Sequence, residues 1–595
     1  MTTMMKTSRW VKMGIGAGAV VLVFLFLQSR YAFNYFYEEQ FRMFRFSADY
    51  AVAAFRKVGG PVEYVASFFI QFFAFPYVGA AVSALLFGAV AGGVRCGFLR
   101  LSGGKEMPLA YWLPGFFFLW AEADFNHHFE AGLAFLAVVW LFALWERLFP
   151  RRNRWAVAAA VPVAWGLYWL VGPLALLWVV AVALTGLCRK GTARWLFLLF
   201  LPVALLAPLV VYAADLSDAP LSALLTATAY SHPLSPDPWW ENGAALTWLA
   251  CLGMALLFPL CPKGQRPAVR YVSWSVQTLV AGVLFCQVAL RTNNERNYAV
   301  KLLDYYAFHG RWTDLLAAPG FRPSENLLHT CYQNLALVKM GKLSEVLLQT
   351  PQRGTQGFWP AWNKTAPVSA LLSDVAYTMG NVALSQVLAF EGLVGSERSE
   401  NPRLLLRLVQ TNLIQGAYPV AAKYIGLLRQ TFAYRKAAEH YAAFLYDDAR
   451  VEADDELGPL RRCLSKTEGL TNVAMAPVDL LQVMRSNPSY RPAFEYFGAF
   501  CLVAKDLASL RLMLDEFRSA PALVPLPRLY QEAVVVLLEG EPDRWADYGV
   551  EEATAKRFAE FRQQFMAARR NPALAGALRS NFGRTYWYYM MHSKN

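Results

Sequence analysis

Long apolar runs separated by short polar loops fill the first half of the chain. The first run extends from Met13 to Leu27 and follows three basic residues. A helix needs about 20 mostly apolar residues to cross a bilayer, so the pattern predicts a polytopic bundle of about nine membrane spans. The later runs cover residues 66–94, 108–121, 129–146, 155–170, 174–187, 195–213, 244–260 and 271–290.

The stretch 155–187 allows two interpretations. It contains Gly172-Pro173, which predicts a break between two short spans. A single tilted helix is the alternative. That helix would place Arg189, Lys190 and Arg194 on the opposite side from the other basic loops, so the charges favour two spans.

Basic residues mark alternate loops, which predicts the topology of the chain. Lys and Arg collect in cytoplasmic loops, and no small-residue cleavage site follows the first run, so we expect an uncleaved span with a cytoplasmic N-terminus. An odd number of spans then places the C-terminus outside. The sequence therefore predicts a multi-pass protein of the bacterial inner membrane with a periplasmic C-terminal half. The basic loops contain Arg95/Arg100/Lys105, Arg147/Arg151/Arg152/Arg154, Arg189/Lys190/Arg194 and Lys263/Arg266/Arg270.

Beyond about residue 290 the pattern changes to amphipathic helices joined by short turns. A glycine-led turn recurs at Gly310, Gly341, Gly380 and Gly416, at separations of 31, 39 and 36 residues. These separations bracket the period of about 34 residues of tetratricopeptide repeats, and a degenerate copy is expected at Lys505–Leu510. The predicted fold is all-α, with a transmembrane domain at 1–290 and a tetratricopeptide-like helical solenoid at 291–595. A helical domain without a binding groove is the alternative.

Composition agrees with this division. Of the 595 residues, 56% are hydrophobic and 17% are charged, which is too apolar for an ordinary soluble enzyme. The formal charge of +13 is explained by the basic loops, so nucleic-acid binding is not expected. The C-terminal half has Cys331, Cys463 and Cys501 without metal-ligand spacing, and we expect buried free thiols.

Charged residues follow the first apolar run in the segment "YFYEEQFRMFRFSADY". It contains the acids Glu38, Glu39 and Asp49, together with Arg42 and Arg45. Aromatic residues alternate with these charges, so the segment can lie as a helix in the membrane interface.

Two further outer loops carry candidate ligands. In "WAEADFNHHFE", Glu122 and Asp124 precede His127 and His128, a group that can hold a divalent cation, Mg or Mn, and through it a diphosphate. The loop "AYSHPLSPDPWWENG" offers polar and aromatic groups for a sugar or acceptor. These polar and aromatic groups are His232, Asp237, Trp239 and Trp240. A plainer interpretation is that these acids are solvated caps and these aromatics are interfacial anchors.

This arrangement resembles the C-type (GT-C) membrane glycosyltransferases, which use polyprenyl-linked sugar donors and in some members end in tetratricopeptide repeats. Glu38, Glu39 or Asp49 would match the family's first acidic position, and Glu122-Ala123-Asp124 the second. The resemblance implies an enzyme in which Glu39, helped by Glu38 or Asp49, is the general base for an acceptor hydroxyl. Glu122 and Asp124 would hold the metal.

The same resemblance suggests the remaining roles. Arg42 or Arg45 would contact the donor phosphate through charge-assisted hydrogen bonds, and the helical repeats would hold a protein acceptor or partner. Two alternatives stay open. One is a non-catalytic anchored scaffold for an envelope assembly or secretion machine. The other is a transporter, which the scarcity of charges within the spans disfavours.

Overall fold

The protein is described here from a computed structural model. It covers residues 2–592 apart from 41, 122–127, 150–155, 189–191, 218, 231–238, 258–266, 292–294, 397–399 and 466–475. Helices make up nearly all of the regular structure, and no strand occurs among these residues. The chain forms two compact units. Unit 1 comprises Met1–Glu39 and Phe44–Asn297, and unit 2 comprises Gln40–Met43 and Tyr298–Asn595.

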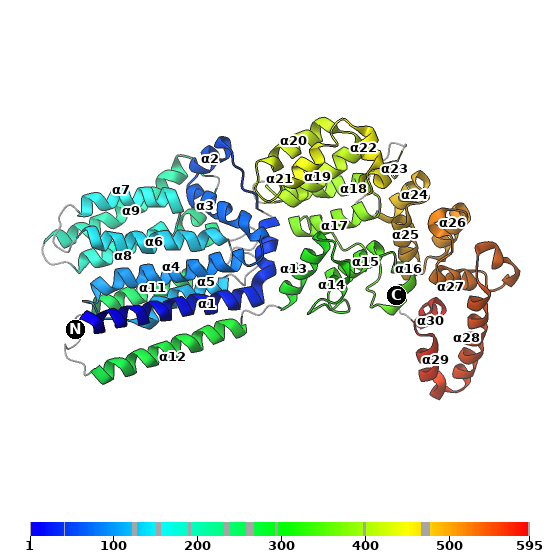
Figure 1. Ribbon diagram of the computed structural model, residues 1–595, viewed down its shortest axis with the longest axis horizontal. Helices are drawn as coiled ribbons and strands as arrows, with labels where there is room; N and C mark the ends of the chain where they lie inside the picture. Colours follow the sequence, from blue (N-terminus) through cyan, green and yellow to red (C-terminus); the bar gives the residue numbers. More distant parts are fainter. Residues whose placement is uncertain are drawn as a thin grey trace. The chain divides into compact units, whose positions relative to one another are not determined.

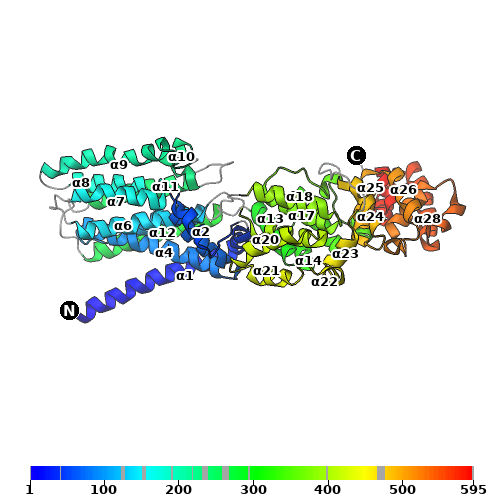
Figure 2. The same cartoon turned by 90° about the horizontal axis from the view of Figure 1, so that it is seen from above.

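Unit 1 is a bundle whose long helices run roughly parallel in both views (Figures 1 and 2). Four of its helical segments are long and apolar enough to cross a membrane: Met13–Gln40, Val78–Leu101, Phe129–Leu148 and Leu196–Ala213. These segments indicate a membrane protein. The helices are α1 (Thr2–Gln40), α2 (Ala48–Phe55), α3 (Gly60–Ile70), α4 (Val78–Leu101), α5 (Pro108–Ala121), α6 (Phe129–Leu148), α7 (Ala156–Val171), α8 (Ala175–Leu187), α9 (Leu196–Ala213), α10 (Leu221–Leu225), α11 (Trp239–Leu257) and α12 (Pro267–Arg291).

Small residues let the helices of unit 1 approach closely. α4 contains several glycines, and α6 packs along it. A Cβ atom on Gly93 would come within 2.8 Å of Val139 Cγ1, so α6 lies directly against the α4 backbone there. Close backbone approach of this kind is how helices associate in lipid, where tails are as apolar as leucine.

A buried tryptophan joins three helices at the centre of the bundle. Trp248 on α11 has no exposed surface. Its ring centroid lies 6.4 Å from that of Phe98 on α4 and 5.2 Å from that of Phe142 on α6. Aromatic pairs at such separations contribute beyond the area that they bury, so Trp248 fixes the mutual positions of these helices.

The stretch 155–187 forms two helices, as the Gly172-Pro173 break predicts. α7 ends at Val171 and α8 begins at Ala175. Gly172 has φ +78°, a left-handed conformation that glycine adopts without strain. The single tilted helix is therefore excluded.

Unit 2 is built from shorter helices joined by tight turns. The helices are α13 (Glu295–Phe308), α14 (Trp312–Leu316), α15 (Leu327–Lys339), α16 (Leu343–Val346), α17 (Ala366–Thr378), α18 (Val382–Val394), α19 (Pro402–Gln415), α20 (Tyr418–Arg429), α21 (Arg435–Ala442), α22 (Asp448–Ala453), α23 (Leu457–Arg462), α24 (Ala476–Ser486), α25 (Arg491–Ala504), α26 (Leu507–Phe517), α27 (Arg528–Leu537), α28 (Glu552–Arg570), α29 (Ala575–Phe582) and α30 (Tyr586–His592).

The recurrent glycines lie where the sequence predicts turns. Gly310, Gly341, Gly380 and Gly416 each separate two consecutive helices, and each has a positive φ between +66° and +84°. Lys505 takes the same place between α25 and α26, with φ +57°. A turn between two helices thus lies where the degenerate copy of the repeat is expected, with a lysine in the left-handed conformation, and the repeat itself stays a prediction. Cys331, Cys463 and Cys501 are buried and free, as expected.

Candidate functional site

The acidic segment after the first apolar run does not form a single interfacial helix. α1 continues through Glu38 and Glu39 and ends at Gln40, a non-helical stretch covers 42–46, and α2 begins at Ala48. The Ser47 side chain caps α2 by accepting a hydrogen bond from the Tyr50 amide at 3.3 Å. Met43 and Phe44 within this non-helical stretch are both buried, and they belong to different units.

The predicted carboxylates differ in accessibility. Glu39 is only 5% exposed, whereas Asp49 is an exposed residue in the first turn of α2. Glu38 is half-buried on α1. Among these three, Asp49 is therefore the acid most open to a ligand arriving from outside the protein.

Aromatic side chains surround the start of α2. The Phe44 ring lies 5.0 Å from Tyr64, 5.4 Å from Phe68 and 5.6 Å from Tyr50, measured between centroids. The Arg45 guanidinium carbon lies 5.2 Å from the centroid of Tyr50. This cation–π contact places Arg45 against Tyr50, the residue that follows Asp49 in the first turn of α2.

Part of this aromatic group is exposed. Phe46, Phe55 and Phe68 are 49%, 51% and 36% exposed, and Tyr77 before α4 is 62% exposed. Apolar rings next to charged groups are the composition that lies in the headgroup region of a bilayer. We call Phe46, Phe55 and Phe68 the aromatic surface of unit 1.

The predicted metal group can be placed only in part. Glu122, Asp124 and His127 lie outside the described residues. His128 directly precedes α6, and its Nδ1 lies 3.3 Å from Glu130 Oε1. Glu130 is 6% exposed and was not among the predicted ligands, although it ends the same acidic motif. No cluster of three His, Cys, Asp or Glu side chains suited to a metal occurs within the described ranges.

The third predicted group is also only partly placed. His232 and Asp237 lie outside the residues that the structure describes. Trp239 and Trp240 are the first two residues of α11. The predicted sugar contact of these two residues stays a prediction.

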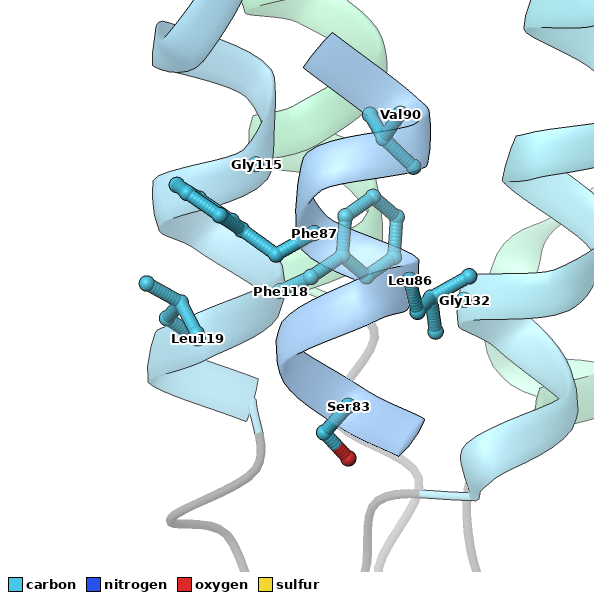
Figure 3. Close-up of a pocket in the computed structure, with 8 residues that line it drawn as sticks. All are labelled: Ser83, Leu86, Phe87, Val90, Gly115, Phe118, Leu119 and Gly132. Carbon is cyan, nitrogen blue, oxygen red and sulfur yellow. The ribbon is translucent and has the colours of Figure 1, made fainter. Parts of the chain in front are cut away.

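A small cavity lies between α4, α5 and α6 (Figure 3). Its volume is about 10 Å³, near the least that can hold one water. Ser83 supplies its one polar side chain. The cavity is therefore a packing defect of the bundle and cannot hold a sugar or a phosphate. It is lined by Ser83, Leu86, Phe87, Val90, Gly115, Phe118, Leu119 and Gly132.

Unit 2 contains a buried ionic cluster that the sequence analysis missed. Arg403 is 4% exposed and lies 2.7 Å from Asp304 and 2.6 Å from Asp374. Arg407 Nη2 donates to the other oxygen of Asp374 at 2.8 Å, and its guanidinium carbon stacks 3.7 Å from the centroid of Tyr377. The spacing of Arg403 and Arg407 along an otherwise leucine-rich helix is a signal that could have revealed the cluster.

Electrostatics explain why these charges persist inside the protein. Burial alone would raise the pKa of Asp374, but the guanidinium groups of Arg403 and Arg407 outweigh it and lower that pKa below its usual range. For Arg403 burial acts to lower the pKa, and the carboxylates of Asp304 and Asp374 raise it well above its ordinary value. Asp374 and Arg403 are therefore held in their charged forms.

Taken together, the fold defines an all-helical protein with membrane-spanning helices and a second, helical unit carrying a buried charge cluster. The chain belongs to the family of unknown function DUF6057, whose model matches residues 6–593. No curated protein and no solved structure matches it.

Proposed function

We propose that this chain is a GT-C-like membrane glycosyltransferase or oligosaccharyltransferase. It would move a sugar or glycan from a polyprenyl-linked donor to an acceptor, proteins included, on the periplasmic side. One observation carries the proposal. Exposed Asp49 lies within four residues of Arg45, beside the exposed aromatic surface and a short distance along the chain from the end of the long apolar helix α1.

The residues of this region suit the chemistry of a lipid-linked donor. The carboxylate of Asp49 is open to an acceptor hydroxyl and could take its proton as general base. Arg42 and Arg45 would bind the donor phosphate through charge-assisted hydrogen bonds. Glu39 is nearly buried, so it could serve as base only for a group that enters the protein as far as the end of α1.

The membrane arrangement that this function needs goes beyond the four long apolar helices. All nine apolar runs would cross the bilayer, including the shorter helices α5, α7, α8, α11 and α12. With the N-terminus in the cytoplasm of a bacterial inner membrane, unit 2 would then be periplasmic. Its hairpins, such as α17/α18 and α19/α20, would form a tetratricopeptide-like solenoid for a protein acceptor or partner.

A divalent ion, Mg or Mn, would be held in the loop before α6. His128 and Glu130 offer two ligand atoms there, and Glu122, Asp124 and His127 would complete the set. Such an ion would neutralise charge on the donor phosphates.

Transfer of labelled glycan in membranes that contain the full chain tests this proposal. The Asp49→Asn, Glu39→Gln and Asp124→Asn variants should each lower the transfer rate about 100-fold or more, the usual contribution of a general base or of charge stabilisation. Glu552→Gln changes an acid whose side chain is 81% exposed in unit 2, and it should leave the rate unchanged. Full activity in all three variants at normal protein levels would overturn the mechanism.

A second function, a membrane-anchored scaffold for an envelope assembly or secretion machine, is favoured by one helix of unit 2. Val387, Phe390 and Val394 on α18 are 42%, 50% and 57% exposed and lie on one face of the helix. An exposed apolar stripe of this kind marks a protein contact. If the scaffold role is correct, Phe390→Asp abolishes the function in cells and Asp49→Asn has no effect. The transferase predicts that Asp49→Asn abolishes it.

A further inference from the structure

Four residues of the chain belong to unit 2 although both of their flanks belong to unit 1. The chain leaves unit 1 after Glu39, contributes Gln40–Met43 to unit 2, and returns to unit 1 at Phe44. The two ends of this segment are buried, since Gln40 is 3% exposed and Met43 is 4% exposed.

We propose that Gln40–Met43 is an internal ligand of unit 2, which holds this segment on a built site of α13, α17 and α19 and so tethers unit 2 to the membrane helix α1 without a covalent bond. The site has a polar half, which binds Gln40, and an apolar half, which binds Met43. We call the segment the tether and its site the tether site.

The polar half of the tether site is the guanidinium of Arg403, which other side chains of unit 2 also hold in place. Arg403 Nη1 donates to Gln40 Oε1 at 2.8 Å. The same guanidinium is held by Asp304 and Asp374, and its carbon lies 5.3 Å from the centroid of Phe308. Because these contacts preorganise Arg403, little conformational entropy is lost when the Gln40 amide binds.

A second layer of contacts supports Asp304. It accepts a hydrogen bond from the Tyr332 hydroxyl on α15 at 2.9 Å. At the start of α19, Asn401 caps the helix by accepting from the Leu404 amide at 3.0 Å, which fixes the turn that carries Arg403. The polar half therefore draws on α13, α15, α17 and α19.

The apolar half surrounds Met43. This side chain is buried in one cluster with Ala370 and Tyr377 of α17 and with Leu404 and Leu408 of α19. The flexible thioether of methionine fills an irregular gap well. A hydrogen-bonded amide and a buried methionine three residues apart give the segment a specific register on the site.

The tether site also changes how unit 2 is expected to bind other proteins. A foreign extended peptide that needed Arg403 and the Met43 pocket would have to displace the chain's own segment. We infer that a protein partner binds elsewhere on unit 2. The tether proposal does not depend on the transferase activity.

Cutting the full chain in its membrane tests the tether. A protease recognition sequence is inserted between Arg291 and Glu295, and the membranes are treated with that protease. The fragment that begins near Glu295 then has no covalent link to unit 1. The fragment carrying unit 2 should stay with the membranes after washing. Met43→Asp, which places a charge in the apolar half, should raise the released fraction about tenfold or more.

A matched control and a milder variant make the result decisive. Met566→Asp changes a methionine that is 52% exposed on α28, and it should leave release at the wild-type level. If Met43→Asp protein does not accumulate, the Gln40→Ala/Met43→Ala variant removes the same contacts without adding charge and should also release the fragment. Release from the unaltered protein, or retention in both tether variants, would overturn the proposal.

Discussion

Arg403 shows at the scale of one residue how unit 2 tolerates charge in its interior. A buried ion costs several kcal/mol unless partners compensate for its lost hydration. Here the guanidinium has the carboxylates of Asp304 and Asp374 and the amide of Gln40. Removing one charged member therefore leaves the charge of its partners buried without compensation.

Arg403→Ala should lower the free energy of unfolding of unit 2 by about 3–5 kcal/mol, the usual cost of breaking a buried ion pair on one side. This loss is measured by unfolding the full chain with denaturant in detergent, with the protease resistance of unit 2 as the readout. Arg544→Ala is the control, because Arg544 pairs with Glu541 at the surface, where solvent screens such pairs and they contribute little. Equal losses in the two variants would contradict a stabilising cluster.

The pKa of Asp374 predicts a pH dependence of stability. Because that pKa is lower in the folded protein than the value of about 3.9 in an unfolded chain, folding favours the ionised carboxylate. The stabilisation is complete above about pH 5 and is lost as the pH falls through 3.9 toward the folded pKa. Asp374→Asn should remove this slope of stability against pH. Melting temperatures between about pH 3 and 6 measure the slope in both proteins. Parallel profiles for the two proteins would show that Asp374 does not supply the slope.

Adjacent glycines of α4 give a prediction at the scale of helix packing. A Cβ on Gly93 would meet Val139 Cγ1 at 2.8 Å, whereas a Cβ on Gly92 would meet Trp140 at an ordinary 3.7 Å. Gly93→Ala should destabilise unit 1 by about 1–3 kcal/mol through overpacking. Gly92→Ala is expected to be neutral or to stabilise by up to about 1 kcal/mol through helix propensity. Thermal stability in detergent distinguishes them, and equal effects would refute close packing of α4 on α6.

Helices were the elements that the sequence predicted best, because a period of hydrophobic residues is a local signal. The runs 108–121, 174–187 and 195–213 agree closely with α5, α8 and α9. The turn at Gly416 was equally readable, since a positive φ favours glycine.

Contacts between distant elements could not be predicted in this way. Gln40 and Arg403 are 363 residues apart, and nothing local to either residue indicates the pairing. The end of α1 was missed for a related reason. The run of apolar residues ends at Leu27, but the helix continues to Gln40 because Tyr31 and Tyr35 pack against the rest of unit 1. His128 was predicted as a metal ligand, and its contact with Glu130 depends on how α6 begins.

At the scale of the whole molecule, the sequence makes a testable prediction of the side of the membrane on which the loops of unit 1 and the whole of unit 2 lie. The alternation of basic loops predicts that the turn at Gly103-Gly104, after α4, is cytoplasmic and that unit 2 is periplasmic. Gly104 and Met566 are both exposed, so a cysteine at either position is accessible to a reagent on its own side. Cys96, Cys188 and Cys286, which are exposed among the described residues, and Cys261, which lies outside them, are first changed to alanine to remove background.

In cells with a permeable outer membrane, a maleimide that cannot cross the inner membrane should label Met566→Cys at once. It should label Gly104→Cys only after lysis. Because an odd number of crossings separates a cytoplasmic N-terminus from a periplasmic unit 2, this pattern also requires that the shorter apolar helices add an odd number of crossings to the four long ones. Labelling of both positions from the same side would contradict the topology, and with it a transferase whose acceptor lies outside the cytoplasm.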